Sequence, residues 1–597
     1  MLMNEQRKAK NIKGTIAKLL AYMKVYKIGL LLVVLFAVGG TIFGIVGPKI
    51  LGEATTEIFN GLVSKVRGGV GIDFSKIGRI ILILIGLYVV STLLSFIQGY
   101  LMTGITQKVT YRMRKEISEK INRLPMQYFD KVPHGEVLSR VTNDVDTLSQ
   151  SLNQSATQVI TAVVTIIGVL IMMLSINVRM TLVALVLLPV SMGFLAIIMK
   201  RSQKYFASQQ ASLGKINGQV EEVYGGHNIV KVFNREEDSI KEFDEINDAL
   251  YGSAWKSQFF SGMMMPIVQF VGNLGYVGIT ILGGYLAAKK VIEVGDIQSF
   301  IQYVRNFTQP LQQIAQAANM LQSMAAASER VFEFLSETEE QDGETQVLDV
   351  ARVKGNVEFK HVRFGYNPEQ IVIKDFSMKV ESGQKVAIVG PTGAGKSTLV
   401  KLLMRFYDVN SGEIKIDGES TKNFKRQDLR QAFGMVLQDT WLFNGSIMEN
   451  IRYGKEDATD DEVKAAAKAA YVNRFVQTLP NGYNMVLNEE ASNVSQGQKQ
   501  LLTIARAILA DPKILILDEA TSSVDTRTEL QIQKAMNNLM KDRTSFVIAH
   551  RLSTIRDADV ILVMRDGDIV EQGSHEELMK RRGFYAELYN AQFEQSA

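Results

Sequence analysis

Long charge-free stretches punctuate the first half of this 597-residue chain. About 20 apolar residues cross the hydrocarbon core of a bilayer as a helix, and irregular backbone is not tolerated against lipid there. Five stretches are long enough, at residues 28–48, 80–107, 147–178, 180–199 and 257–288. A sixth, at residues 297–318, is weaker because Arg305 interrupts it. The sequence therefore predicts an all-α membrane domain of six spanning helices.

The sixth stretch can also be interpreted as an amphipathic helix of a soluble domain. We favour a span, because an odd number of spans would put the C-terminal half, with the nucleotide motif described below, on the side away from ATP. Polar residues in this stretch recur every three or four positions, at Gln298, Gln302, Arg305, Gln309, Gln312, Gln316 and Asn319. This spacing places them on one helical face, and a polar face exposed to lipid is costly. We therefore expect the sixth span to line a wet translocation path.

Charged segments between the stretches set the expected orientation. The basic N-terminal segment precedes an apolar run that is too long for a cleavable signal peptide, so we expect a cytoplasmic tail at residues 1–27. With six spans, residues 108–146 and 200–256 are cytoplasmic too, and both are expected to extend their spans as charged helices. Residues 49–79 are expected to form a longer, glycine-containing connection on the outside.

Three consecutive methionines, Met263 to Met265, precede Pro266 in the fifth span. Flexible thioethers suit a promiscuous apolar binding surface, and they suit the filling of gaps in a core equally well. We favour core filling for these side chains.

Composition excludes several kinds of site. The chain has no cysteine, so disulfides, thiolate catalysis and cysteine-ligated zinc are excluded. Its five histidines are too scattered along the sequence for a zinc site. The net charge of +4 carries no signal for nucleic acid, and we expect no nucleic-acid partner.

A glycine-rich loop at residues 390–397 reads Gly-Pro-Thr-Gly-Ala-Gly-Lys-Ser. It follows an apolar run at residues 385–389 that predicts a strand, and it precedes residues 398–404, which predict a helix. This context distinguishes a phosphate-binding P-loop from a chance glycine-rich turn. Glycines let backbone N–H groups and the helix N-terminus point at phosphates, while the lysine reaches them and the serine hydroxyl binds Mg²⁺. The expected nucleotide contacts are Gly390, Thr392, Gly393, Gly395, Lys396, Ser397 and Thr398.

A second motif lies further along the chain, where an apolar run at residues 514–517 ends in Asp518 and Glu519. The run predicts a buried parallel strand, and open α/β sheets bind ligands at the carboxyl ends of such strands. We expect Asp518 to hold Mg²⁺ or its water, and Glu519 to orient or deprotonate the attacking water. The alternative is a solvated strand end, which the upstream P-loop disfavours.

Between these motifs, residues 493–500 read Asn-Val-Ser-Gln-Gly-Gln-Lys-Gln. This segment resembles the signature motif of ABC transporter ATPases, whose usual form is Leu-Ser-Gly-Gly-Gln. Further elements are similar to the family's adenine-stacking aromatic (Tyr366), Q-loop glutamine (Gln438), D-loop (522–525) and switch histidine (His550). The resemblance implies that Gln438 senses Mg²⁺ and contacts the membrane domain, and that His550 contacts the γ-phosphate.

The resemblance covers the whole chain, with six spans before one ATPase domain as in ABC exporters. Residues 124–130 and 221–233 look like the two cytoplasmic loops of the exporters' membrane domain. In this family, ATP is held between the P-loop of one ATPase domain and the signature of another. The resemblance therefore implies that this chain is a half-transporter that dimerises in the bilayer. It also implies nucleotide contacts from Ser495, Gly497, Gln498 and Asp525.

Gln496 departs from the family pattern, because it stands at a glycine position of the signature. A glutamine makes the close approach of backbone N–H groups to the γ-phosphate poorer. The catalytic set of the P-loop side is nevertheless intact, with Lys396, Ser397, Gln438, Asp518, Glu519 and His550. We infer a heterodimer whose other subunit has lost its catalytic glutamate. The alternative is a homodimer that tolerates Gln496.

The resemblance implies ATP-driven export of hydrophobic or amphipathic compounds by alternating access, with ATP and Mg²⁺ as cofactors. It places the chain in a bacterial cytoplasmic (inner) membrane, with the ATPase domain in the cytosol. A lipid flippase, an ATP-gated channel or sensor, and a soluble ABC ATPase are the alternatives. The expected parts are a tail at residues 1–27, a membrane domain at 28–335, a linker at 336–354 and an α/β ATPase domain at 355–597.

Overall fold

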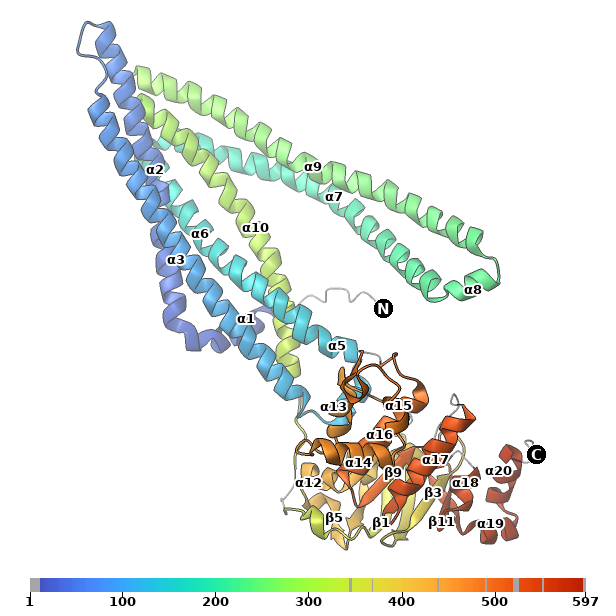
Figure 1. The fold of residues 1–597 in the computed structure, drawn as a ribbon. Coiled ribbons are helices and arrows are strands. Elements are labelled where there is room, and N and C mark those ends of the chain that lie inside the picture. The colour runs from blue at the N-terminus through green and yellow to red at the C-terminus, as the bar shows by residue number, and fades with distance from the viewer. Residues whose placement is uncertain are drawn as a thin grey trace. The chain divides into compact units, whose positions relative to one another are not determined.

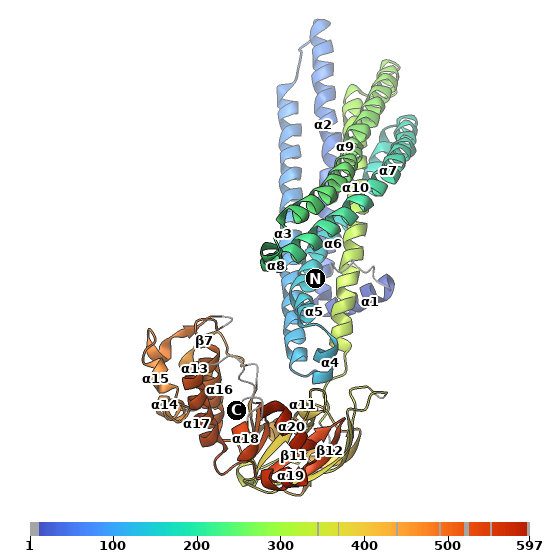
Figure 2. The same ribbon diagram turned by 90° about the vertical axis from the view of Figure 1, so that its right-hand side faces the viewer.

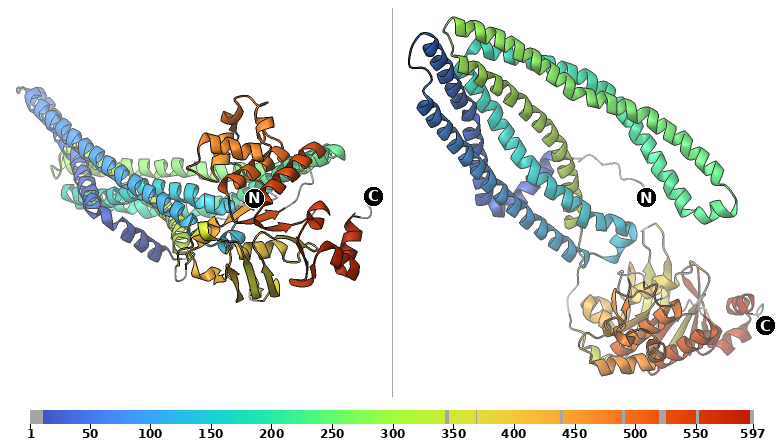
Figure 3. Two further views of the ribbon diagram at one scale, coloured as in Figure 1. Left: turned by 60° about the horizontal axis from the view of Figure 1, so that its bottom comes forward. Right: turned by 45° about the horizontal axis from the view of Figure 1, so that its top comes forward.

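The computed structural model describes residues 11–342, 346–367, 369–437, 440–488, 491–518, 525–549 and 552–593. The chain forms two compact units, which Figures 1, 2 and 3 show from several sides. The N-terminal unit runs to Asn122 and resumes over His134–Glu337, and the C-terminal unit takes Arg123–Pro133 and everything from Thr338 onward. The short helix α4 (Met126–Lys131) therefore belongs to the C-terminal unit, although it lies between two helices of the other in sequence.

The N-terminal unit is helical throughout its described residues. Its elements are α1 (Ile12–Met23), a 3₁₀ turn (Lys24–Tyr26), α2 (Lys27–Val66), α3 (Phe74–Ile121), α5 (His134–Ser139), a π turn (Arg140–Asp144), α6 (Val145–Ile176), α7 (Val178–Gly225), α8 (His227–Val232), α9 (Glu236–Ala288) and α10 (Val294–Ser336). Over the described residues, five helical segments, which contain α2, α3, α6, α7 and α9, are long and apolar enough to cross a membrane. α10 is also long enough, but its polar residues keep it outside this group.

The charged segments expected as helical extensions are largely helical. α3 continues to Ile121, α7 continues to Gly225, and α9 begins at Glu236. α7 and α9 lie side by side, with α8 at their far end, and this pair diverges from α2, α3, α6 and α10 (Figure 1).

The prediction of a long connection at residues 49–79 is wrong. α2 continues through Pro48 to Val66, and only residues 67–73 connect it to α3. A proline inside a helix removes one backbone hydrogen bond and crowds the preceding turn. Here α10 supplies two hydroxyl donors to the backbone of α2 near the proline. Tyr303 Oη donates to Ile45 O at 2.9 Å, and Ser299 Oγ donates to Pro48 O at 2.8 Å. These bonds fasten α10 to the backbone of α2 just before the proline and at the proline itself.

Two glycines bring the backbones of α2 and α10 into direct contact. A Cβ atom added to Gly295 would lie 1.8 Å from Gly52 O, and one added to Gly52 would lie 2.6 Å from Gly295 O. Gly295 N also donates to Thr56 Oγ1 at 3.1 Å. Phe300 and Tyr303 are fully buried on the same side of α10. This packing fixes which face of α10 turns toward α2.

The far end of α10 is held by a partly buried ion pair. Arg330 Nε lies 3.1 Å and 3.0 Å from the two carboxylate oxygens of Asp144, which ends the π turn before α6. The helix α1, which was not expected within the N-terminal tail, packs nearby, with the ring of Tyr22 6.0 Å from that of Phe332.

The C-terminal unit is α/β, as expected. Its helices are α4, α11 (Lys396–Leu403), α12 (Arg426–Gln431), α13 (Ile447–Arg452), α14 (Asp460–Ala469), α15 (Asn473–Val476), α16 (Gln496–Ala510), α17 (Thr526–Met540), α18 (Leu552–Arg556), α19 (His575–Arg581) and α20 (Phe584–Phe593), with 3₁₀ turns at Val350–Arg352, Thr421–Asn423 and Gly482–Asn484. Its strands are β1 (Val357–Phe364), β2 (Ile373–Val380), β3 (Lys385–Val389), β4 (Ser411–Ile416), β5 (Glu419–Ser420), β6 (Phe433–Val436), β7 (Gly445–Ser446), β8 (Val486–Leu487), β9 (Ile514–Asp518), β10 (Thr544–Ile548), β11 (Val560–Arg565) and β12 (Asp568–Gly573).

The strands form a six-stranded sheet in the order β12-β11-β3-β10-β9-β6, a four-stranded antiparallel sheet in the order β2-β1-β4-β5, and the pair β7-β8. The strands from β11 to β6 in the larger sheet are parallel. One face of this sheet packs against α13, α14, α16 and α17, and the other packs against α11 and the antiparallel sheet. Burial on both faces explains the continuous apolar runs within β3 and β9.

The acidic segment after Ser336 is docked on the C-terminal unit over its described residues. Glu340 pairs with Arg426 at 3.1 Å and with Arg430 at 3.3 Å, both from α12. Arg426 N also donates to Asp342 Oδ1 at 3.1 Å. The side chain of Arg426 is only 9% exposed, so these carboxylates neutralise a nearly buried charge.

Candidate nucleotide site

The P-loop follows β3 directly and leads into α11. Its three glycines have positive φ angles, of 152° at Gly390, 87° at Gly393 and 100° at Gly395. A Cβ atom at Gly390 would lie 2.2 Å from Met564 O. Glycine is therefore required at this position both by backbone conformation and by space. The loop leaves a backbone cradle at the N-terminus of α11, the geometry that binds phosphate.

Lys396 occupies the centre of this loop. Its Nζ donates to Gly390 O at 2.7 Å and to Pro391 O at 3.0 Å. Burial lowers the pKa of Lys396, and the nearby carboxylate of Asp518 acts in the opposite direction. The lysine thus holds a positive charge inside the cradle, within the electrostatic reach of Asp518.

The remaining P-loop residues divide by exposure. Thr392 and Ser397 are exposed, as a ligand to phosphate or metal has to be. Thr398 is buried, and its Oγ1 forms a hydrogen bond with the hydroxyl of Tyr366 at 3.2 Å. The ring of Tyr366 packs edge-on against Tyr407, with 5.1 Å between centroids. The structure therefore brings the expected adenine-stacking ring next to the P-loop helix.

Asp518 lies at the same sheet edge as the P-loop. β10 stands between β3 and β9, and Ile548 pairs with Ile388 on one side and with Asp518 on the other. The carboxyl ends of the three strands are therefore aligned. The three expected catalytic residues, Glu519, His550 and Gln438, lie outside the described residues.

A Mg²⁺ ion bound with nucleotide takes one or two protein oxygens and keeps the rest of its octahedron for phosphates and water. The hydroxyl of Ser397 and the carboxylate of Asp518 are suitable hard donors at this edge. Among the described residues, no cluster of three acidic or histidine side chains forms a site that would bind a metal without nucleotide. The residues present therefore fit a nucleotide-bound Mg²⁺ ion.

The signature residues begin α16. Ser495 caps this helix by accepting from Gln498 N at 3.3 Å, and Gln498 Oε1 accepts from Ser495 N at 2.9 Å. Gly497 is buried in the first turn. The side chain of Gln496 is exposed and donates from Nε2 to Thr440 Oγ1 at 3.3 Å. Within the described parts of the chain, no hydrogen bond joins these signature residues to the P-loop, and Figure 2 shows α16 and α11 in different parts of the unit.

Arg506, further along α16, was not singled out in the sequence. It donates to Asn450 O at 2.8 Å and to Trp441 O at 3.2 Å, and its guanidinium lies 5.1 Å from the Tyr453 ring centre. Burial lowers its pKa, with Tyr453 acting in the opposite direction. The available signal was an arginine within the apolar run 504–508, which indicates a charge with buried partners. Arg506 thus attaches the segment after the Q-loop to the signature helix.

Asp525 follows the undescribed part of the D-loop and caps α17. Its Oδ1 accepts from Arg527 N at 3.1 Å and from Thr528 N at 3.0 Å. The hydrogen bond from the Thr528 backbone is the main reason that the pKa of Asp525 is lowered. Asp525 is therefore an anionic helix cap in this chain, and its expected contact with nucleotide stays a prediction.

Comparison with known proteins agrees with both halves of the structure. Residues 30–311 match the family model described as ABC transporter transmembrane region, and residues 373–522 match the one described as ABC transporter. A protein of Mycobacterium tuberculosis named as a fatty acid ABC transporter ATP-binding/permease protein is 45% identical over 590 residues, covering 94% of this chain and 93% of its own. The chain belongs to the ABC transporter family.

Two relatives from Bacillus subtilis extend this comparison. The uncharacterized ABC transporter ATP-binding protein YfiC is 43% identical, covering 99% of this chain and 96% of its own length. The probable multidrug resistance ABC transporter ATP-binding/permease protein YheH is 35% identical, and the match covers 86% of this chain and 77% of YheH. The ABC transporter described here is thus an exporter-type half-transporter, an integral membrane protein that couples ATP hydrolysis to transport. Half-transporters of this family dimerise.

Proposed function

We propose that this chain is one half of a heterodimeric exporter, which carries hydrophobic or amphipathic compounds across a bacterial cytoplasmic membrane by alternating access. The observation that carries the dimeric part is the separation of the P-loop from the signature helix α16 within one ATPase unit. One chain then offers two incomplete half-sites, and a second subunit completes both. Moving such a closure equilibrium from 1:99 to 99:1 takes about 5.5 kcal/mol of differential binding.

In this proposal the P-loop side of the chain is hydrolytic. Lys396 and the loop glycines bind the phosphates, while Ser397, Asp518 and Gln438 hold Mg²⁺. The bound ion would neutralise phosphate charge. Glu519 orients or deprotonates the attacking water, and His550 contacts the γ-phosphate. Tyr366 stacks on adenine, a role supported by its position beside α11.

The membrane part of the proposal is supported by α10. The face packed on α2 carries Gly295, Ser299 and Tyr303, whereas Gln302, Arg305, Gln309 and Gln316 are exposed on the chain by itself. Because polar side chains are costly against lipid, they would face a wet path or the other subunit. Gln302→Cys, Gln309→Cys and Gln316→Cys in this cysteine-free chain should react with a water-soluble thiol reagent in at least one nucleotide state. If none of the three cysteines reacted in any nucleotide state, α10 would not line the translocation path.

The heterodimer is proposed on Gln496, which adds a side chain where the signature usually has glycine. The site formed with this signature would be the weak one, on a partner that has lost its catalytic glutamate. The proposed orientation places the N-terminal segment and the ATPase unit in the cytosol. It is supported by the basic residues of the N-terminal segment and of residues 108–146 and 200–256.

The test is purification of the chain alone and with the candidate second subunit encoded beside its gene. Reconstituted in liposomes, the pair should hydrolyse ATP and respond to amphiphiles, whereas the single chain should not. A stable homodimer with amphiphile-stimulated ATPase activity would overturn the heterodimer and favour a homodimeric flippase. A lipid-like cargo is the second candidate, supported by the name of the 45%-identical relative, a fatty acid transporter.

A further inference from the structure

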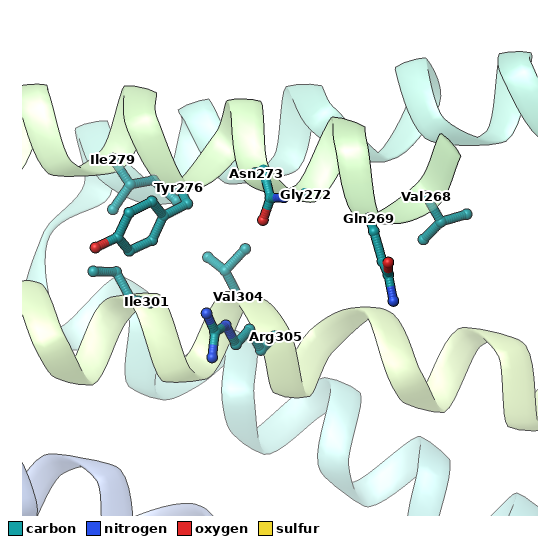
Figure 4. Close-up of a pocket in the computed structure, with 9 residues that line it drawn as sticks. All are labelled: Val268, Gln269, Gly272, Asn273, Tyr276, Ile279, Ile301, Val304 and Arg305. Atoms are coloured by element: carbon teal, nitrogen blue, oxygen red, sulfur yellow. The ribbon is translucent and has the colours of Figure 1, made fainter. Parts of the chain in front are cut away.

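A cavity of about 460 Å³ lies between α9 and α10. This volume lies within the range of small-molecule pockets. Gln269, Asn273 and Tyr276 line it from α9, opposite Arg305 from α10 (Figure 4). The rest of the lining is largely aliphatic, including Val304 between the two helices. The cavity thus combines an apolar wall with a cluster of hydrogen-bonding groups around one cation.

Arg305 is the one charged residue in the six membrane stretches 28–48, 80–107, 147–178, 180–199, 257–288 and 297–318. It lies eleven residues after Val294, the first residue of α10, which is about 16 Å along a helix at 1.5 Å per residue. The hydrocarbon core of a bilayer is about 30 Å thick. Arg305 therefore lies well inside the expected sixth span at residues 297–318, where an ionisable residue is costly unless it has a function or a partner.

The described residues provide no counter-ion for this charge. No carboxylate among them forms an ion pair with the Arg305 guanidinium. The nearest acidic residues in the sequence of α10 are Asp296 and Glu329, about 13 Å and about 36 Å away along the helix. The side chain is also exposed on the chain by itself. On the single chain, the guanidinium is therefore open to an anionic group that the chain itself does not supply.

We propose that this cavity binds the anionic head group of an amphiphile, with Arg305 as the counter-ion. The inference rests on the proposed function, transport of amphipathic compounds, and it names the charge of the cargo. A guanidinium binds a carboxylate or a phosphate through two parallel hydrogen bonds. The amide groups of Gln269 and Asn273 and the hydroxyl of Tyr276 provide further donors for the remaining oxygen lone pairs.

The apolar tail has a place along α9. Phe260, Met264 and Val268 are spaced by four residues, so they lie on one face, and Val268 lines the cavity. None of the three is buried on the chain. Met265 is 54% exposed, whereas Met263 and Met264 are half-buried, so core filling does not apply to Met265 on the single chain and stays a prediction for the other two. The flexible thioether of Met264, one helical turn from the cavity-lining Val268, suits alkyl chains of different lengths.

The experiment uses the transporter purified with its second subunit and reconstituted in nanodiscs. Four probes share one alkyl chain and differ in head group: dodecanoate, dodecyl phosphate, dodecanol and dodecyltrimethylammonium. Their half-saturating concentrations are measured by equilibrium binding and by stimulation of ATP hydrolysis, normalised to the basal rate of each variant. The variants are Arg305→Gln, Arg305→Lys and the matched control Arg179→Gln, which removes the same charge from the exposed first turn of α7.

In the wild type, one or both anionic probes should bind more tightly than dodecanol, and which of the two does so identifies carboxylate or phosphate as the preferred head group. Arg305→Gln should raise the half-saturating concentration of the preferred anion by about tenfold or more, as expected for the loss of hydrogen bonds to a charged group. The half-saturating concentration of dodecanol should stay within about twofold of the wild-type value. The affinity of Arg305→Lys for the preferred anion should lie between those of the wild type and Arg305→Gln. Arg179→Gln should bind all four probes as the wild type does.

Two outcomes would overturn the inference alone. Neutral and cationic probes could stimulate the wild type as well as anions do, or Arg305→Gln could weaken all four probes equally. Reduced recovery of the dimer in Arg305→Gln, without an anion preference in the wild type, would instead assign Arg305 to a carboxylate of the second subunit. If no probe bound or stimulated ATP hydrolysis in the wild type, the proposed cargo class would fail as well.

Discussion

The side-chain amide of Gln496 donates a hydrogen bond from Nε2 to Thr440 Oγ1 across 3.3 Å. Gln496 is the first residue of the signature helix α16, and Thr440 stands two residues after the expected Q-loop glutamine. Arg506 attaches the next residue of that segment, Trp441, to the same helix. Displacement of the Q-loop segment therefore displaces the signature helix, which links the region expected to contact the membrane domain with the second half-site.

Thr440→Val tests this link, because it removes the acceptor oxygen and keeps the shape of the side chain. The exposed hydrogen bond is worth about 0.5 kcal/mol, so amphiphile stimulation of ATP hydrolysis should fall about two- to threefold. ATP affinity should stay within about twofold of the wild type. Thr440→Ser retains the hydroxyl and should behave as the wild type. An equal loss in both variants would show that the hydrogen bond has no such role.

Lys396→Ala and Glu519→Gln should separate nucleotide binding from hydrolysis. Lys396→Ala removes the cation from the phosphate cradle and should weaken ATP binding by about tenfold or more. Glu519→Gln should retain ATP binding and lower turnover by about 10²- to 10⁴-fold, as for loss of a general base. Equilibrium binding of a fluorescent ATP analogue and release of phosphate measure the two effects. Wild-type turnover in Glu519→Gln would exclude the role proposed for this carboxylate.

Asp144→Ala should destabilise the N-terminal unit. The Asp144 side chain is 7% exposed and the Arg330 side chain is 35% exposed. The effect of breaking this ion pair should therefore lie between those known for buried and for surface ion pairs. We expect the free energy of unfolding to fall by about 2 kcal/mol, which would be measured as a lower apparent melting temperature in detergent. The double variant Asp144→Leu with Arg330→Met should recover part of it, because neither charge is then left unpaired. A double variant less stable than Asp144→Ala would contradict this explanation.

His575 should make the stability of the C-terminal unit depend on pH. Burial lowers its pKa below the usual 6.5, the nearby Arg556 lowers it further, and Nδ1 lies 2.8 Å from the Tyr585 hydroxyl. Below pH 6.5 the unfolded chain binds the proton more readily, so the free energy of unfolding should fall as the pH decreases; above it the effect vanishes. His575→Gln should show a smaller loss of melting temperature between about pH 7.5 and about pH 5.5. An unchanged pH dependence would exclude the contribution.

Local patterns predicted the elements around the nucleotide site closely. The strand expected at residues 385–389 is β3, and the run 514–517 lies within β9, because strands buried on both faces have an unambiguous apolar sequence. The P-loop was recognisable because its glycines have backbone conformations that other residues rarely adopt. Glu519, His550 and Gln438 rest on the sequence alone.

Long-range partners explain the features that the sequence did not predict. Nothing in the sequence indicated that hydroxyls of Ser299 and Tyr303, about 250 residues later in the chain, bond to the backbone of α2 near Pro48. The acidic segment containing Glu340 was predicted to be a linker. Its ion-pair partners, Arg426 and Arg430, lie in α12, far from it in the sequence, so the sequence did not indicate that they pair with it. Such pairings depend on the tertiary fold and leave no local pattern.

The contact between Gly52 and Gly295 restricts where this membrane unit can deform. The two backbones touch with no side chain between them, and the hydrogen bonds of Gly295, Ser299 and Tyr303 join α10 to α2 around this contact, so we expect α2 and α10 to move together. The wall of the cavity that is free to shift is then α9, with α7 alongside it. Release of a bound head group would come from α9 withdrawing while Arg305 stays in place.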